Sequence, residues 1–344
     1  MKKVLTLFTA AALTASMSMA AFAEDGTEPL KCGPVPPRKT EKPNYAIGKL
    51  YLDEDGEIPD CIPREQLQFR VTALEGNPDD TMISIAPHEV KENPDHIAID
   101  VPKYTKVGRY NYQVQELSGN TQGVEYAAEP LNVQILAQWN EDHSAIVTTM
   151  SFTTASGEKK VDTFLNHYDL GELDIEKEVT GNLGDYDKEF LVDVTFTAEE
   201  GKTVRSDISY EMDGNFYTIP ASAMADGTET VTVSLKHDET VSFDHLPVGI
   251  YYQVTEQDYT AGGTNSENGY DAPVYEVDDD EGQITDQGVQ GRITADNDDV
   301  DVDIINNKGT VVETGVFLDS VPYLILMGIV AVSGVLLLKK RRAV

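Results

Sequence analysis

The sequence predicts an all-β protein that contains two tandem β-sandwich domains. Apolar and polar residues alternate with a period of two in short runs, for example at 67–71, 110–114, 190–196 and 231–235. Clusters of Gly, Asp, Asn and Pro separate these runs, and no long amphipathic helix is evident, which is a pattern typical of β-sandwiches. Between its two targeting ends the chain has about 290 residues, enough for two domains of ordinary size.

Residues 1–23 form a predicted signal peptide that is cleaved on secretion. Lys2 and Lys3 precede an uncharged run that closes with Ala21-Phe-Ala23, the small-x-small pattern that signal peptidase recognises. Residues 24–44 follow as a predicted N-terminal arm. This stretch is rich in proline, which favours an extended chain.

The chain has two cysteines, Cys32 in the arm and Cys61 in a loop rich in Gly, Pro and Asp. Two cysteines cannot build a disulfide scaffold or a zinc site with four thiolate ligands. In an oxidising compartment a Cys32–Cys61 bridge would attach the arm to the first domain. Two unpaired or intermolecular thiols are the alternative.

Residues 311–344 contain a predicted transmembrane helix. The uncharged, mostly apolar run from Val321 to Leu338 is followed directly by four basic residues at 339–342. At about 1.5 Å per residue, such a helix just crosses a hydrocarbon core of roughly 30 Å, and the basic cluster stays on the cytoplasmic side. We therefore predict a secreted, membrane-anchored precursor that displays the rest of the chain outside the cell.

The composition excludes several classes of partner and cofactor. The chain has 26 Lys and Arg against 60 Asp and Glu, a formal net charge of −34, which argues against nucleic acid as a partner. The acidic stretches between Glu276 and Asp303 lack the ligand alternation and turn glycine of a calcium loop, and the histidines occur singly. We expect no metal site and no cofactor, and we expect Trp139 to lie in the core.

The two halves of the chain share a weak internal repeat. The first copy contains Tyr45-Ala-Ile-Gly-Lys49, a Tyr-rich run ending at Glu116, and Phe164-Leu-Asn166; the second contains Leu173-Asp-Ile-Glu-Lys177, a similar run ending at Glu256, and Ile304-Ile-Asn306. The glutamate and the asparagine are 50 residues apart in both copies. We infer a tandem duplication, with a first domain at 45–170, a second domain at 171–310, and the junction in a short link at 167–172.

Each copy places one Lys, one Glu and one Asn on an apolar strand face, because residues two apart on a strand face the same way. These residues are Lys49, Glu116 and Asn166 in the first domain and Lys177, Glu256 and Asn306 in the second. Asn307 is a competing acceptor, but it lacks the parity that Asn306 shares with Ile304. Three polar groups inside one core are costly unless they satisfy one another.

Burial should bring each lysine and glutamate to their neutral forms. Desolvation disfavours charge, so it lowers the pKa of the amine and raises the pKa of the carboxyl group. A neutral amine is a nucleophile, and a protonated glutamic acid can hydrogen-bond the asparagine carboxamide and shuttle protons. The predicted product is a Lys–Asn isopeptide bond, formed once per domain with loss of ammonia.

The chain resembles the T-antigen-type (FctA-type) backbone pilins of Gram-positive bacteria. The resemblance runs from about residue 40 to the end, and it is clearest in Lys177-Glu-Val-Thr-Gly181, Leu246-Pro-Val-Gly-Ile-Tyr-Tyr-Gln-Val-Thr-Glu256, Gly157-Glu-Lys-Lys-Val161 and the run from Pro322 to Val332. It implies immunoglobulin-like domains, each with one Lys–Asn isopeptide bond promoted by a glutamate. By matching positions, these are Lys49, Glu116 and Asn166, then Lys177, Glu256 and Asn306.

The same resemblance implies polymerisation by a pilin-type sortase, which cleaves after a threonine and joins its carbonyl to a lysine of the next subunit. The matching motif is Val311-Val-Glu-Thr-Gly315, with cleavage between Thr314 and Gly315. This motif lacks the proline of ordinary wall-sorting motifs, which favours a sortase dedicated to pilins. Lys159 or Lys160 is the implied acceptor.

The predicted function is a structural backbone pilin subunit, joined head to tail to identical subunits in a surface fibre, with minor pilins at the tip and base as further partners. The final location is the cell wall or the pilus. The alternative is a sortase-anchored monomeric adhesin built from the same domains. A surface hydrolase that uses paired carboxylates has no supporting motif, so we do not expect an enzyme.

Overall fold

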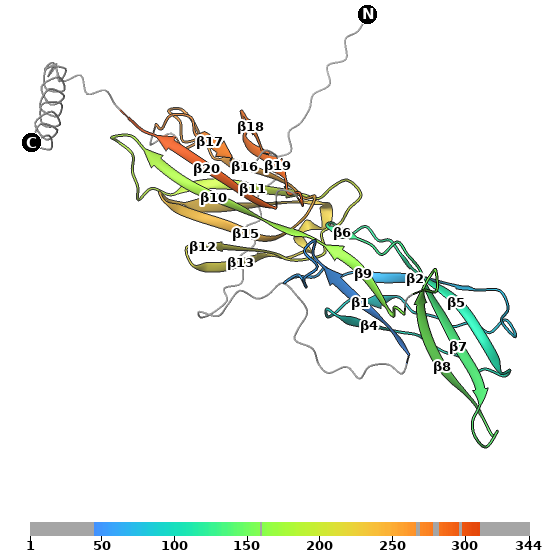
Figure 1. The fold of residues 1–344 in the computed structure, drawn as a ribbon. Helices are drawn as coiled ribbons and strands as arrows, with labels where there is room; N and C mark the ends of the chain where they lie inside the picture. The colour runs from blue at the N-terminus through green and yellow to red at the C-terminus, as the bar shows by residue number, and fades with distance from the viewer. Residues whose placement is uncertain (1–44, 159, 266–268, 278–281, 296–297, 310–344) are drawn as a thin grey trace, which may run out of the picture.

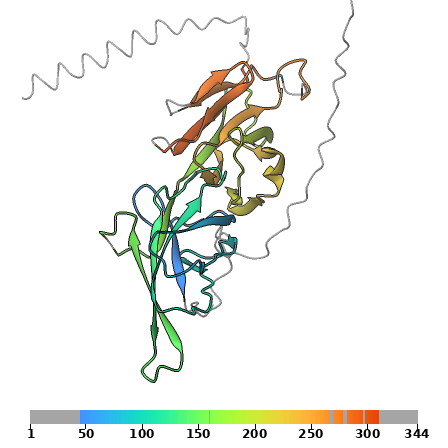
Figure 2. The ribbon, with the colours of Figure 1, turned by 90° about the vertical axis from the view of Figure 1, so that its right-hand side faces the viewer.

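The structure is a computed structural model that describes residues 45–158, 160–265, 269–277, 282–295 and 298–309. Within these residues the protein is all-β, as predicted: strands β1 to β20 are accompanied by one short 3₁₀ helix, η1 (Ala223–Asp226). Figures 1 and 2 show two bodies that lie end to end, the first built from β1 to β9 and the second from β10 to β20.

The first domain pairs a four-stranded sheet in the order β4-β1-β9-β6 with a five-stranded sheet in the order β3-β2-β5-β7-β8. Its strands are β1 (Ala46–Leu52), β2 (Gln66–Ala73), β3 (His88–Glu89), β4 (Asp95–Ala98), β5 (Gly108–Leu117), β6 (Val124–Glu125), β7 (Leu131–Trp139), β8 (Ile146–Thr154) and β9 (Thr163–Tyr168). Residues of both sheets form one buried cluster, with Ile47 and Phe164 from one sheet and Tyr112 and Val133 from the other.

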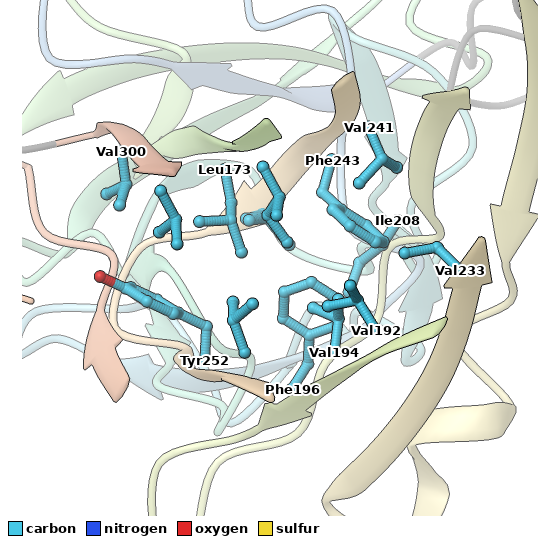
Figure 3. Close-up of a cluster of buried hydrophobic side chains, with 14 of the residues drawn as sticks. Leu173, Val192, Val194, Phe196, Ile208, Val233, Val241, Phe243, Tyr252 and Val300 are labelled. Atoms are coloured by element: carbon cyan, nitrogen blue, oxygen red, sulfur yellow. The ribbon is translucent and has the colours of Figure 1, made fainter. Parts of the chain in front are cut away.

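The second domain pairs a six-stranded sheet in the order β13-β12-β15-β10-β20-β17 with a five-stranded sheet in the order β14-β11-β16-β19-β18. Its strands are β10 (Leu170–Thr180), β11 (Phe190–Thr197), β12 (Ile208–Met212), β13 (Asn215–Ile219), β14 (Thr228–Leu235), β15 (Glu239–Pro247), β16 (Tyr251–Glu256), β17 (Val274–Val277), β18 (Gln283–Thr285), β19 (Gly288–Arg292) and β20 (Asp299–Asn307). Figure 3 shows its core, in which Leu173 and Phe243 of one sheet face Val194 and Tyr252 of the other.

The alternating runs that predicted strands all lie in strands. The runs at 67–71, 110–114, 190–196 and 231–235 fall within β2, β5, β11 and β14. In β11 the alternation of buried and half-buried residues is complete, so its hydrophobic face is the one that faces the core. The expectation for Trp139 was wrong: its side chain is 48 % exposed, because β7 and β8 continue beyond the sandwich as a hairpin that projects from the far end of the domain (Figure 1).

The predicted link at 167–172 lies mostly inside strands. β9 ends at Tyr168 and β10 begins at Leu170, so Asp169 alone separates the last strand of the first domain from the first strand of the second. Contacts across this junction include a buried hydrogen bond of 2.6 Å between the Tyr168 and Ser206 hydroxyls. The two domains are thus joined by one residue and by direct hydrogen bonds across their junction.

Several predicted features lie outside the described residues. These are the signal peptide at 1–23, the arm at 24–44 with Cys32, and the segment at 311–344 with Thr314 and Gly315. No helix in the described part of the chain is long and apolar enough to cross a membrane.

Candidate functional site

The first domain brings Lys49, Glu116 and Asn166 together inside its core. Lys49 Nζ lies 3.2 Å from Glu116 Oε1 and 3.1 Å from Oε2, and Asn166 Nδ2 donates a hydrogen bond of 2.7 Å to Glu116 Oε1. The three residues are at most 2 % exposed. One carboxyl group thus bridges the amine and the carboxamide.

The second domain repeats this arrangement with Lys177, Glu256 and Asn306. Asn306 Nδ2 donates a hydrogen bond of 2.7 Å to Glu256 Oε2, and Lys177 Nζ lies 3.5 Å from Glu256 Oε1. The amine also donates to the backbone carbonyls of Ile304 at 2.8 Å and Glu178 at 3.0 Å. Lys177 and Asn306 are fully buried, and Glu256 is 6 % exposed.

Strand pairing explains why each lysine meets its asparagine. β1 and β9 are parallel, with Lys49 opposite Phe164, and β10 and β20 are parallel, with Lys177 opposite Ile304. In both domains the asparagine lies two residues beyond the partner of the lysine, so the two side chains point to the same face.

The glutamates come from the facing sheet. Glu116 is on β5 and Glu256 is on β16, so each carboxyl group reaches the Lys–Asn pair from the opposite side of the sandwich.

Burial shifts the pKa of every ionisable group in the two sites toward the neutral form. Desolvation lowers the pKa of Lys49 and of Lys177 from 10.5 to about 8, against the attraction of the neighbouring glutamates. Desolvation also raises the pKa of Glu116 and Glu256, although the nearby lysine and asparagine oppose that shift. Transfer of one proton from the amine to the carboxyl group is therefore much easier here than in water.

An aromatic ring lies beside each amine. Lys49 Nζ is 4.7 Å from the centre of the Tyr51 ring, and Lys177 Nζ is 4.6 Å from the centre of the Phe190 ring. These rings exclude water from the amines and limit where they can move.

The two sites differ at the carboxamide oxygen. Asn166 Oδ1 accepts a hydrogen bond of 2.9 Å from the backbone N–H of Ala127, whereas Asn306 Oδ1 is buried with no hydrogen-bond partner among the described residues. Asn307, the competing acceptor, is exposed and its Nδ2 donates to Asp271 at 2.6 Å. The structure thus places Asn306, and not Asn307, at the glutamate.

The other predicted site residues are placed only in part. Lys160 is exposed in the loop between β8 and β9, while Lys159, Thr314 and Gly315 lie outside the described residues. Cys61 is fully buried and disulfide-bonded, but Cys32 also lies outside the described residues, so the Cys32–Cys61 pairing stays a prediction.

Two groups beside the first site were not predicted from the sequence. One is the Ala127 N–H, a backbone donor that leaves no signal in the sequence. The other is Glu65, which is 4 % exposed and accepts hydrogen bonds from the Tyr51, Thr121 and Tyr126 hydroxyls. Glu65 comes directly before β2 and lies outside the alternating run at 67–71 that predicted this strand, so that alternation could not have identified it.

Comparisons with known sequences match both domains separately. Residues 49–169 match the FctA family, described as a Spy0128-like isopeptide containing domain, and residues 171–308 match a domain of unknown function (DUF7601). A pilin from Streptococcus pyogenes serotype M1 is 31 % identical over 244 residues, covering 70 % of this chain and 69 % of that protein.

Solved structures show a similar fold. The crystal structure of the major pilin from Streptococcus pyogenes gives a TM-score of 0.50 at 22 % identity and covers 79 % of this chain and all of that chain. A mutant of the same major pilin also gives a TM-score of 0.50 at 22 % identity, covering 77 % of this chain and 98 % of that chain. At this level of identity the likeness concerns the fold alone.

Proposed function

The chain belongs to the T-antigen-type backbone pilin family of Gram-positive bacteria, and from that premise we propose that it is the repeating subunit of a covalent surface fibre, with one self-formed isopeptide bond in each domain. The observation that carries this proposal is the pair of buried Lys–Glu–Asn triads, each with the amine and the carboxamide on one carboxyl group.

The triad geometry accounts for each step of bond formation. The glutamate takes a proton from the lysine, and the neutral amine attacks Cγ of the asparagine. The C–N bond to the lysine forms while the Cγ–Nδ2 bond breaks. The protonated glutamic acid gives its proton to the departing nitrogen, to which it is already hydrogen-bonded at 2.7 Å, and takes one proton from the attacking nitrogen, so that ammonia leaves and a neutral amide remains. The glutamic acid ends protonated and the lysine is consumed, so there is no turnover.

The bond would connect the first and last strands of each domain. β1 and β9 are neighbours in one domain, and β10 and β20 in the other. A covalent link between neighbouring parallel strands holds them together when the hydrogen bonds of the ladder are broken by heat or force. This suits a subunit that bears tension along a fibre.

Polymerisation is proposed from the family pattern. A pilin-type sortase would cleave between Thr314 and Gly315 and join the Thr314 carbonyl to Lys159 or Lys160 of the next subunit. Lys160 is exposed, as an acceptor must be. Export by the signal peptide at 1–23 and retention by the helix within 311–344 would present the precursor to the sortase, and minor pilins at the tip and base are further proposed partners.

Intact mass tests the isopeptide bonds. Each bond removes one ammonia, about 17 Da, so the reduced, signal-processed chain should weigh about 34 Da less than its sequence. The full sequence mass would refute both bonds.

An immunoblot of boiled cell-wall extract tests polymerisation. A ladder of high-mass species is expected for a pilin and a single band for a monomeric adhesin. Thr314→Ala should collapse the ladder, and Lys159→Ala and Lys160→Ala, made separately, should identify the acceptor. A ladder that survives Thr314→Ala would refute the proposed cleavage site.

A further inference from the structure

Residues 120–127 form a segment of the first domain that is anchored on the second domain. The Gln122 side chain is 2 % exposed; its Nε2 donates to the Val248 carbonyl at 2.8 Å, and its Oε1 accepts from the Glu199 N–H at 3.0 Å. The Gln122 N–H also donates to the Thr203 carbonyl at 2.9 Å. Three hydrogen bonds of one residue thus depend on the docked second domain.

The same segment is held from inside the first domain by Glu65. Thr121 Oγ1 donates to Glu65 Oε2 at 2.7 Å, and the Tyr126 hydroxyl donates to the same oxygen. The other carboxylate oxygen accepts from the hydroxyl of Tyr51, whose ring lies beside the amine of Lys49. A continuous set of buried contacts therefore runs from the domain junction to the first reactive lysine.

The end of the segment touches the reacting carboxamide. β6 lies antiparallel to β9, with Val124 opposite Tyr168, and this pairing brings the Ala127 N–H to Asn166 Oδ1 at 2.9 Å. As an amine adds to Cγ, negative charge develops on this oxygen, and a backbone N–H directed at it stabilises the transition state. Asn306 Oδ1 has no such donor among the described residues.

We propose that the segment 120–127 is a positioning element that makes formation of the first isopeptide bond depend on docking of the second domain. The inference rests on the proposed function. Anchored through Gln122, the segment holds the Ala127 N–H against Asn166 Oδ1 while Lys49 attacks. Released from the second domain, it loses the Gln122 hydrogen bonds and those that join Asn120 to Gly201, Thr203 and Arg205, and it spends less time in the reactive arrangement. A first domain that leaves the secretion channel first would then react slowly until the second has folded.

The test measures the rates of both bonds in one molecule. The full chain is synthesised in a cell-free system, samples are stopped in guanidinium, and cross-linked Lys49–Asn166 and Lys177–Asn306 peptides are quantified by mass spectrometry. Gln122→Ala removes two anchoring side-chain bonds. It should slow the first bond about tenfold or more, since each bond contributes a factor of about five to the anchored population, and leave the second unchanged.

Gln134→Ala is the matched control. Gln134 is an exposed glutamine of the same domain whose side chain donates to Asn111 Oδ1, a residue outside the segment 120–127, and its loss should change neither rate. A first bond that forms at the wild-type rate in Gln122→Ala would overturn the inference. A wild-type chain that forms neither bond would refute the proposed function instead, so the two failures are distinguishable.

Two further variants distinguish a loss of positioning of the segment 120–127 from a general loss of stability of the protein. Ser206→Ala removes the partner of the Tyr168 hydroxyl from the second domain without touching the segment, and it should slow only the first bond. Gln122→Glu keeps the acceptor for the Glu199 N–H but places a buried carboxylate oxygen against the Val248 carbonyl oxygen, so its first-bond rate should fall at least as far as that of Gln122→Ala. A first-bond rate that follows the thermal midpoint of the variants, and not their anchoring contacts, would overturn the inference.

Discussion

Replacing Lys177 with Met isolates the contribution of the second isopeptide bond to stability. Lys177 is fully buried, and its amine lies between Glu256 and the carbonyls of Ile304 and Glu178. Methionine has a similar length and no nucleophile, so Lys177→Met should fill the same space while it prevents the cross-link. Glu256 keeps its hydrogen bond from Asn306 in this variant.

The expected loss follows from the size of the closed loop. A bond between Lys177 and Asn306 closes a loop of about 130 residues, which restricts the unfolded chain by about 5 kcal/mol on the scale used for disulfides. In the cross-linked protein the Lys177 nitrogen is a neutral amide, so a thioether in its place relieves no buried charge. The loss of about 5 kcal/mol should lower the thermal midpoint of the second domain by about 15–20 °C, at about 3–4 °C per kcal/mol for a domain of this size.

Differential scanning calorimetry and intact mass together provide the measurement. The variant should show one domain transition moved to lower temperature, and its mass deficit should be about 17 Da, half of the wild-type value. Lys188→Met is the matched control: Lys188 Nζ also lies over the Phe190 ring, at 5.6 Å, but Lys188 is not part of the triad. The reasoning would be refuted if Lys177→Met kept the full mass deficit, or if it lost one bond with no change in either transition.

Three more outcomes follow from the same geometry. Glu116→Gln should abolish only the Lys49–Asn166 bond, and Glu256→Gln only the Lys177–Asn306 bond, because each site has its own carboxyl group. Peptide mapping measures both bonds, and the loss of both in either variant would contradict this prediction. The reactive Lys–Glu pair holds one proton, and burial lowers the pKa of both lysines to about 8. The rate of bond formation should therefore fall above about pH 8, where the pair loses this proton, and also in acid, where both groups are protonated. A rate that keeps rising beyond pH 10 would be the contrary result. Asp303 lies opposite Glu176 on one neighbouring strand and Glu276 on the other, and like charges directly opposite each other destabilise a sheet. Asp303→Asn should therefore stabilise the Lys177→Met protein by about 0.5–1 kcal/mol in urea titrations, whereas the control Asp226→Asn in η1 should not. Equal urea midpoints for Lys177→Met with and without Asp303→Asn would argue against repulsion across this sheet.

Much of the fold was predictable because the alternation of apolar and polar residues indicates which face of a strand is buried. Residues 190–196 alternate in the sequence, and in β11 the same residues alternate between buried and half-buried. The hairpin of β7 and β8 was not predictable in the same way. Trp139 continues the alternating strand, but the facing sheet does not extend far enough to cover it.

The sequence by itself determined the identity and order of the triad residues. Parity on a strand, a repeated spacing of 50 residues and the family resemblance together selected Lys49, Glu116 and Asn166 and their counterparts, because all three signals can be read from the sequence.

Only the tertiary structure decided which strands are neighbours and which groups surround the triads. Parallel pairing of β1 with β9, the approach of Glu116 from the facing sheet, and the anchoring of Gln122 on the second domain all join residues that are distant in sequence. Such pairings depend on how whole sheets pack, and a backbone donor such as the Ala127 N–H is present at nearly every residue of any chain, so neither leaves a pattern that a sequence can show.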